Sequence, residues 1–189
     1  MDAMSIKLAL EKRIIPFVTH VRVPPNVITL CALAFTLAAA GLVMAEALVI
    51  AGVLILIAGI LDILDGAVAR ATNTATAFGA LLDRVSDRIG DFAVLGSLIA
   101  AGYTEITLGL YTLLTVMLAS YISACIEAAT HSRVGEKLSL RAVRIALIVL
   151  ACFAMRINEA MVILAVVGTY SSVTRMAQAW RLLDAGAQA

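Results

Sequence analysis

The sequence contains few of the residues that hold disulfide scaffolds or zinc sites, and it carries little excess charge. Three cysteines and two histidines occur in 189 residues. Cys31, Cys125 and Cys152 lie in apolar runs without C-x2-C or Cys/His spacing. This pattern is typical of small core residues and implies neither a disulfide framework nor a zinc site. The formal net charge is +1, without an acidic or basic tail, so nothing indicates a nucleic-acid partner.

Charged residues as a class are scarce, because apolar residues dominate the composition. Apolar residues make up 62% of the chain, against 14% charged residues, and mean hydropathy is +1.03. Soluble domains are close to half apolar, so this composition predicts an integral membrane protein. No repeat of fixed period and no low-complexity linker divides the sequence, which favours a single domain.

Residues 1–22 lack the long apolar core and the small-residue cleavage site of a signal peptide. Apolar residues instead recur there at steps of three and four, at Ile6, Leu10, Ile14, Phe17 and Val21. Lys7, Glu11 and Lys12 occupy another face of the same helix. We predict that residues 1–22 form an amphipathic juxtamembrane helix in the plane of the lipid headgroups. A water-facing amphipathic helix is the alternative.

Six apolar runs follow, and each approaches the roughly 20 residues that a helix needs to cross a hydrocarbon core about 30 Å thick. They extend over residues 25–44, 48–70, 75–101, 107–130, 140–155 and 159–183. Charged residues interrupt the third run. The sequence therefore predicts an all-α integral membrane protein. Its six transmembrane helices form one domain, residues 23–189, preceded by the juxtamembrane helix.

Basic residues cluster on one side of these predicted spans. An even number of spans puts both termini on the same side, and every lysine and arginine except Arg156 falls on that side. The positive-inside rule then predicts a multi-pass cell-membrane protein with both termini in the cytoplasm. The connections on the other side, near Glu46, Glu105 and Asn158, are short. We therefore expect the active site to face the cytoplasm.

Aspartates stand out at the end of the second span and the start of the third. Asp62 and Asp65 are three residues apart, and Asp83 and Asp87 are four apart, so each pair projects from one helical face. A carboxylate inside a membrane span costs about 2.5–3.5 kcal/mol on insertion scales. Four or five of them on two adjacent helices, counting Asp91, are therefore poorly explained as incidental surface residues.

Two facing helices joined by a short turn would bring these carboxylates together, and their mutual repulsion then requires compensation. Divalent cations can supply it, and oxygen ligands without histidine or cysteine favour Mg²⁺ or Mn²⁺ over zinc. Internal salt bridges are the alternative, because Arg70, Arg84 and Arg88 lie among the aspartates.

Small residues accompany the aspartates at one-turn intervals. Gly66 follows Asp65 directly, Ala69 lies about one turn further, and Gly79 precedes Asp83 by one turn. They leave the backbone open to close approach by a flat ligand, although tight helix packing is a second use of such residues. Arg70, at the end of the span, is suited to bind a phosphate with its planar guanidinium.

Together these residues form the motif D-x2-D-G-x2-A-R-x8-G-x3-D-x3-D from Asp62 to Asp87, with every fixed position matched. This motif resembles the signature of the CDP-alcohol phosphotransferases, also called CDP-alcohol phosphatidyltransferases. The six-span layout, the amphipathic amino-terminal segment and the Pro25-Asn26-x2-Thr29 opening also resemble that family. The resemblance therefore covers most of the chain.

The resemblance implies a role for each residue of the motif. Two divalent cations, Mg²⁺ or Mn²⁺, are expected to bind Asp62, Asp65, Asp83 and Asp87. Asp87 is also expected to act as the catalytic general base on the acceptor hydroxyl. The CDP site is expected to be lined by Gly66, Ala69, Arg70, Thr76 and Gly79. A homodimer would also be in keeping with the family.

A segment of the fourth span bears on the acceptor. Residues 120–127 resemble S-Y-x-[RK]-A-[RK]-A-E of the inositol-phosphate-using members, but Ser123 and Cys125 replace its two basic positions. Residues 140–144 resemble the E-R-A-x-R of the same subgroup, keeping Arg141 and Arg144 and losing the leading glutamate. The nearest subgroup is therefore the inositol-phosphate-using phospholipid synthases, with an incomplete acceptor pattern.

A basic cluster at the edge of the fourth and fifth spans suits a phosphorylated acceptor, since two or three such residues can satisfy a phosphate dianion. It consists of Arg133, Lys137, Arg141 and Arg144. The positive-inside rule alone also predicts cations there. Both interpretations remain open at this level.

The sequence thus predicts a metal-dependent enzyme that moves a phospho-alcohol group from a CDP-linked donor, a CDP-lipid, to a polyol phosphate. CMP is released, and inositol phosphate is a candidate acceptor. Alternatives within the family are a glycerol-phosphate acceptor and a soluble CDP-polyol donor. A different class, a divalent-cation transporter using the aspartates as its ion site, is disfavoured because broken helices and internal repeats are not evident.

Overall fold

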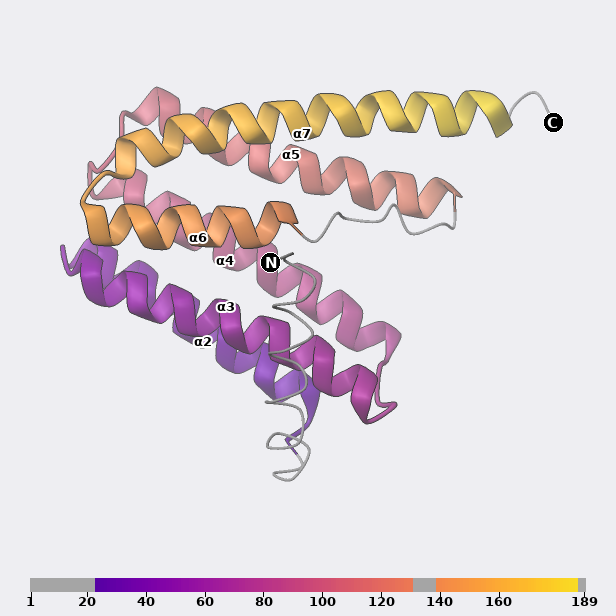
Figure 1. Cartoon of the computed structure of the whole chain (residues 1–189), viewed down its shortest axis with the longest axis horizontal. Coiled ribbons are helices and arrows are strands. Elements are labelled where there is room, and N and C mark those ends of the chain that lie inside the picture. The colour runs from indigo at the N-terminus through magenta and orange to yellow at the C-terminus, as the bar shows by residue number, and fades with distance from the viewer. Residues whose placement is uncertain (1–22, 131–138, 187–189) are drawn as a thin grey trace, which may run out of the picture.

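The computed structural model describes residues 23–130 and 139–186, and these fold into six α-helices (Figure 1). The helices are α2 (Pro25–Met44), α3 (Leu48–Ala71), α4 (Ala77–Ala100), α5 (Ile106–Thr130), α6 (Ser139–Ala154) and α7 (Ile157–Gly186). All six predicted helical segments are confirmed, and the largest difference is at the end of α7, which continues to Gly186. The predicted juxtamembrane helix, Arg133 and Lys137 lie outside the described residues.

Four of these helices are long and apolar enough to cross a membrane: α2, α3, α5 and α7. The other two predicted spans do not meet that description. α6 has 16 residues, which is about 24 Å of helix at 1.5 Å per residue. α4 has 24 residues but carries five charged side chains, at Asp83, Arg84, Asp87, Arg88 and Asp91. The structure thus confirms an all-helical membrane-type fold, with four candidate spans in the described part.

Four helices end in the same type of tight turn, which lets the chain reverse direction within a few residues. A residue one or two positions beyond the helix end has a positive φ, at Glu46 (61°), Asn73 (54°), Gly102 (77°) and Met155 (54°). The next backbone N–H then bonds a carbonyl five residues back, as in Thr74 N to Ala69 O at 3.0 Å. This Schellman arrangement satisfies helix-end carbonyls and explains the short connections.

The bundle packs as neighbouring pairs, with α2 against α3 and α4, α3 against α6, and α5 against α7. Glycines allow the close approaches. A Cβ on Gly52 would lie 3.0 Å from Cys152 Cβ across the α3–α6 contact, and one on Gly168 would lie 2.6 Å from Thr115 Oγ1 across α5–α7. Small residues at such contacts are common between helices in membranes.

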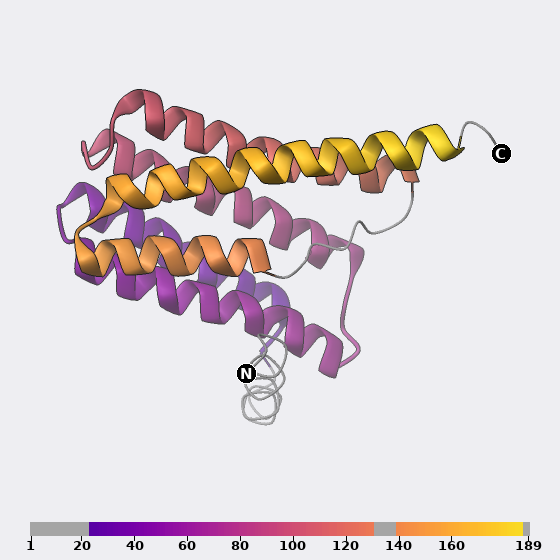
Figure 2. The ribbon, with the colours of Figure 1, turned by 45° about the horizontal axis from the view of Figure 1, so that its top comes forward.

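The two ends of the bundle differ in content. The α2–α3, α4–α5 and α6–α7 turns share one end, on the left in Figures 1 and 2, whereas the α3–α4 turn lies at the other. The buried apolar cluster is built from residues close to the three-turn end, including Val43, Leu48, Leu98, Cys152 and Met161. Apart from Asp91, the charged residues of α3, α4 and α6 lie nearer the α3–α4 end. Hydrophobic packing therefore fixes one end and leaves the other for a polar site.

Candidate active site

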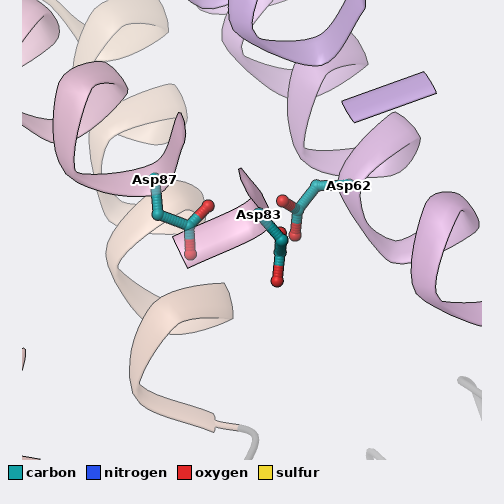
Figure 3. A group of neighbouring side chains, drawn as sticks. All are labelled: Asp62, Asp83 and Asp87. Carbon is teal, nitrogen blue, oxygen red and sulfur yellow. The ribbon is translucent and has the colours of Figure 1, made fainter. Parts of the chain in front are cut away.

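The turn between α3 and α4 brings the motif aspartates together. Thr76 caps α4 by accepting the Gly79 N–H at 3.0 Å. Ligand oxygens of Asp62, Asp83 and Asp87 all lie within 4.8 Å of one another, and the three side chains point toward a common space (Figure 3). This confirms the expectation that facing carboxylates converge.

Arg141 of α6 closes this group from the opposite side. Its Nη1 lies 2.6 Å from Asp62 Oδ2, and its Nη2 forms an ion pair with Asp87 Oδ1. The salt-bridge alternative thus contributes to the site in two ways. Arg141 was not considered for it from the sequence, whereas Arg88 was, and Arg88 pairs with Asp91 at 2.9 Å. Arg84 instead pairs with Glu127 at 2.6 Å. Arg88 Nη2 lies 3.9 Å from Asp87, the outer limit of an ion pair.

Asp65 has a different environment from the other three motif aspartates. Its side chain is buried, and its Oδ2 accepts a hydrogen bond of 2.5 Å from Thr29 Oγ1 of α2. Thr29 is part of the opening that resembled the family, and this bond gives it a role. Asp65 lies outside the three-carboxylate group, so its assignment as a metal ligand stays a prediction.

The residues predicted to line the CDP site surround the α3–α4 turn. Arg70 folds back along its helix, so that its Nη1 would lie 3.2 Å from a Cβ on Gly66. A Cβ on Gly79 would lie 3.0 Å from Asn26 Oδ1 and 3.1 Å from Thr76 Oγ1. Close packing therefore explains glycine at position 79, and ligand approach there stays a prediction. Ala69 is half-buried beside them.

Two cavities meet at this site. The first, which we call the carboxylate cavity, has Thr29, Asp62, Asp87 and Asp91 in its wall. The second, which we call the arginine cavity, lies among α4, α5, α6 and α7. Its polar and charged lining residues are Arg88, Ser120, Arg141, Arg144, Ser171 and Arg175. Arg141 and Arg144 line both cavities, so they separate a negative compartment from a positive one.

Arg144 belongs to an ion-pair group next to the carboxylates. Its Nη2 lies 2.8 Å from Asp91 Oδ1, and Asp91 Oδ2 lies 2.9 Å from Arg88 Nη1. Arg88 Nη1 also donates to Ser120 Oγ at 2.5 Å. Ser120 is the first residue of the segment that resembled the inositol-phosphate subgroup, so this contact links α4 to that segment.

Arg175 was missed as a site residue, because the sequence analysis counted it only among the cations of the positive-inside pattern. Its Nη1 donates to Ala119 O at 2.7 Å and to Ser123 Oγ of α5. Ser123 stands where the subgroup pattern has a basic residue. The guanidinium of α7 therefore supplies a positive charge beside the position where α5 lacks one. The usable signal was an arginine within a predicted span, with no other charged residue between Glu159 and Arg181.

The chemistry of the donor set agrees with a divalent metal site. Three carboxylates within 4.8 Å offer oxygen ligands, and no cysteine or histidine is among the group. Hard cations such as Mg²⁺ and Mn²⁺ prefer ligands of this kind. Arg141 already shares Asp62 and Asp87, which shows that this group of carboxylates binds positive charge.

Comparison with known proteins agrees with the motif and the fold. The model of the CDP-alcohol phosphatidyltransferase family matches residues 22–173. The chain is 33% identical over 128 residues to an archaetidylinositol phosphate synthase of Methanothermobacter thermautotrophicus, covering 64% of this chain and 65% of that protein. It is 42% identical over 72 residues to a phosphatidylinositol phosphate synthase of Mycobacteroides abscessus, covering 35% of this chain and 33% of that protein. The chain thus spans about two thirds or less of the length of these relatives.

Solved structures resemble nearly the whole chain. The crystal structure of Mycobacterium tuberculosis phosphatidylinositol phosphate synthase with CDP-DAG bound has a TM-score of 0.75 and 26% identity, covering 90% of this chain and 93% of that one. The same enzyme in complex with manganese and citrate has a TM-score of 0.75 and 27% identity, covering 90% and 88%.

Proposed function

Because this chain belongs to the CDP-alcohol phosphatidyltransferase family, we propose that it transfers a phospho-alcohol group from a CDP-linked lipid to the hydroxyl of a polyol phosphate. CMP is the second product. The observation that carries this proposal is the convergence of Asp62, Asp83 and Asp87 directly beside a cavity lined by arginines. Inositol phosphate is the proposed acceptor, since relatives are named as inositol phosphate lipid synthases.

The α3–α4 hairpin is proposed to bind the donor. Asp62, Asp65, Asp83 and Asp87 would hold two divalent cations, Mg²⁺ or Mn²⁺. These ions would neutralise the donor's diphosphate and stabilise charge on the leaving group. Gly66, Ala69, Thr76 and Gly79 would let the nucleotide lie against the backbone, and the Arg70 guanidinium would bind a phosphate oxygen. A structural relative with CDP-DAG bound supports a CDP-lipid as donor.

Asp87 is proposed to be the general base. The acceptor oxygen attacks the phosphorus remote from cytidine, its proton passes to the Asp87 carboxylate, and the bond from that phosphorus to the CMP oxygen breaks. Arg141 pairs with Asp87, and both side chains face the carboxylate cavity. A hydroxyl reaching from the arginine cavity would therefore meet Asp87 near Arg141.

Arg141 and Arg144, with Arg133 and Lys137 from the same predicted basic cluster, are proposed to bind the acceptor's phosphate. Arg141 and Arg144 line the arginine cavity together with Arg88 and Arg175. Guanidinium groups bind phosphate oxygens through paired hydrogen bonds, and two or three are enough for a dianion. Arg133 and Lys137 remain proposals on sequence grounds alone.

We further propose that all six helices cross the membrane, so that residues 23–189 form one domain after the juxtamembrane segment 1–22. Of the charges that keep α4 from counting as apolar, Asp87, Arg88 and Asp91 line the two cavities, where ion pairs and substrates would satisfy them. Both termini and the site would face the cytoplasm, as the basic residues predict. A homodimer is a further prediction, which crosslinking in native membranes would check.

The direct test is CMP release by the purified protein with Mg²⁺ or Mn²⁺. Donors would be radiolabelled CDP-diacylglycerol, its ether-lipid analogue and a soluble CDP-polyol. Acceptors would be inositol phosphate, glycerol phosphate and their unphosphorylated polyols. CMP release that requires both a CDP-lipid and a polyol phosphate is expected. If CMP is released from the soluble CDP-polyol and from neither CDP-lipid, the donor is a CDP-polyol instead of a CDP-lipid. No CMP release with any donor and acceptor pair would contradict the proposed function.

A further inference from the structure

We propose that Asp91 is a positioning residue for the acceptor's phosphate, an inference that rests on the proposed function. Asp91 lies outside the Asp62–Asp87 motif and outside the three-carboxylate group. Its two oxygens instead contact two arginines that line the arginine cavity, Arg144 and Arg88. The carboxylate thereby holds two cations from different helices at one wall.

The contacts leave hydrogen-bonding capacity unused at this wall. Asp91 Oδ2 and Arg144 Nε are buried, and neither has a hydrogen-bond partner among the described residues. The 2.9 Å contact between Asp91 Oδ2 and Arg88 is thus an ion pair without hydrogen-bond geometry. Buried polar groups are usually satisfied, so an unpaired guanidinium N–H beside two cavities has capacity for a ligand.

Asp91 also keeps the two charged compartments apart. Arg144 is largely buried, with 12% of its side chain exposed, and removing the carboxylate partner of a buried guanidinium leaves an uncompensated charge. Asp87 lies one turn before Asp91 on the same helix face, so it is a carboxylate available to Arg144 when Asp91 is absent. Arg144 would then turn toward the proposed metal ligands and away from the acceptor.

Two possible roles for Asp91 predict opposite effects on anion binding when its charge is removed. If Asp91 only contributed a negative charge near the cavity, removing that charge would strengthen anion binding. If Asp91 positions Arg144 and Arg88, removing one of its oxygens would weaken anion binding. Asparagine is the informative substitution, because it keeps the shape but offers one acceptor oxygen and points an NH₂ group at the second arginine.

The test is the affinity of inorganic phosphate for the purified full chain, measured by calorimetry in EDTA so that no metal contributes. We expect Asp91→Asn to weaken phosphate binding about tenfold, the effect of one charge-assisted hydrogen bond. Asp91→Glu, which keeps both oxygens, should recover most of the affinity. Glu159→Gln breaks an exposed pair with Arg156 at the other end of the molecule and should leave binding unchanged.

Kinetics separate this inference from the proposed function. With an active acceptor, Asp91→Asn should raise the acceptor KM by the same factor and leave the donor KM unchanged. Tighter or unchanged phosphate binding would overturn the positioning role, and so would equal effects on both KM values. Loss of folded protein in both Asp91 variants would assign a structural role and overturn it too. A wild type that transfers to no polyol phosphate, while Asp91→Asn still loses phosphate affinity, would contradict the function and support the inference.

Discussion

The α3–α4 hairpin and the α5–α7 pair handle buried charge in opposite ways. In the hairpin, Asp62 and Asp83 face each other with Asp87, and their charge is offset by Arg141, which comes from another helix. In the α5–α7 pair, Arg175 of α7 donates to a carbonyl oxygen and a hydroxyl oxygen of α5. One region is organised to attract cations and the other to attract anions. The difference teaches how one site could take two anions: under the proposed function, metal ions on the carboxylates would hold the donor's diphosphate, and guanidinium groups would hold the acceptor's phosphate.

The largest effect is expected from removing a charge in the hairpin. Asp62→Asn, Asp65→Asn and Asp83→Asn should each lower turnover by more than about 100-fold, since even outer-shell partners of a metal are worth 10- to 100-fold. Each protein should remain extractable and folded, because the substitution also relieves repulsion between carboxylates. CMP release and size-exclusion chromatography in detergent measure the two effects. Full activity in a variant removes that aspartate from the site.

The matched control for these variants is Glu159→Gln. Glu159 is an exposed carboxylate paired with Arg156 at 2.8 Å at the opposite end of the bundle. Loss of that pair should leave turnover within about twofold of wild type, because exposed ion pairs contribute little. A large loss of turnover in this control would mean that the assay responds to any lost carboxylate.

The second largest effect is expected at Arg141 and Arg144, which line both the carboxylate cavity and the arginine cavity. Arg144→Ala and Arg141→Ala should raise the acceptor KM about 10- to 100-fold, which corresponds to losing one charge-assisted hydrogen bond. The donor KM should change much less, because the lost contact belongs to the acceptor. Arg144 is the cleaner case, since Arg141 also contacts Asp62 and Asp87. Equal changes in both KM values, or no change, would indicate that these arginines only follow the positive-inside rule and do not bind the acceptor.

The third effect asks whether Asp65 works with the hairpin carboxylates. Thr29→Val keeps the shape of the side chain and removes the hydrogen bond to Asp65. If Asp65 binds metal, Mn²⁺ affinity should fall about tenfold, as for other lost partners of metal ligands. The acceptor KM at saturating metal should stay constant. Unchanged Mn²⁺ affinity, measured by calorimetry, would indicate that Asp65 only joins α3 to α2.

The smallest effect belongs to the α5–α7 pair. Ser123→Ala removes one acceptor from Arg175 and leaves the bond to Ala119 O. The acceptor KM should rise about two- to fivefold, because the bond to Ala119 O still holds the guanidinium in place. Cys125→Ser, at the other departure from the subgroup pattern, is exposed and serves as the control with no expected change. If both variants behave alike, Arg175 does not depend on Ser123.

The sequence predicted the part of the site that two consecutive helices form. It did not predict the contacts between helices that are far apart in the chain. Spacing along α3 and α4 puts Asp62 and Asp83 on facing sides of consecutive helices, so one short turn is enough to join them. The contacts of Arg144 with Asp91 and of Arg175 with Ser123 join helices far apart in the chain. Helical periodicity says which face a residue occupies but not which helix it meets.

For the fold, the sequence predicted the helices but not which of them cross the membrane. Apolar runs predicted all six helices, and the ends of α2 at Pro25 and Met44 were confirmed. Pro25 explains the accuracy at the start, since proline is favoured in the first helical turn. Membrane crossing by α4 and α6 remains untested, because the first carries the charges of the site and the second is short. Composition alone does not distinguish a functional span from a helix that stops at the interface.

The central claim is tested most directly by measuring donor binding and group transfer in the same variant, Asp87→Asn. The claim is that the hairpin binds the donor through shared carboxylates while Asp87 takes the acceptor's proton. Calorimetry with Mg²⁺ should give a donor affinity within about threefold of wild type, because Asp62, Asp65 and Asp83 remain. Single-turnover CMP release at saturating acceptor should fall at least about 100-fold, since an amide does not accept the hydroxyl proton. Release near the wild-type rate would exclude Asp87 as the base, and lost donor binding would contradict the division of roles.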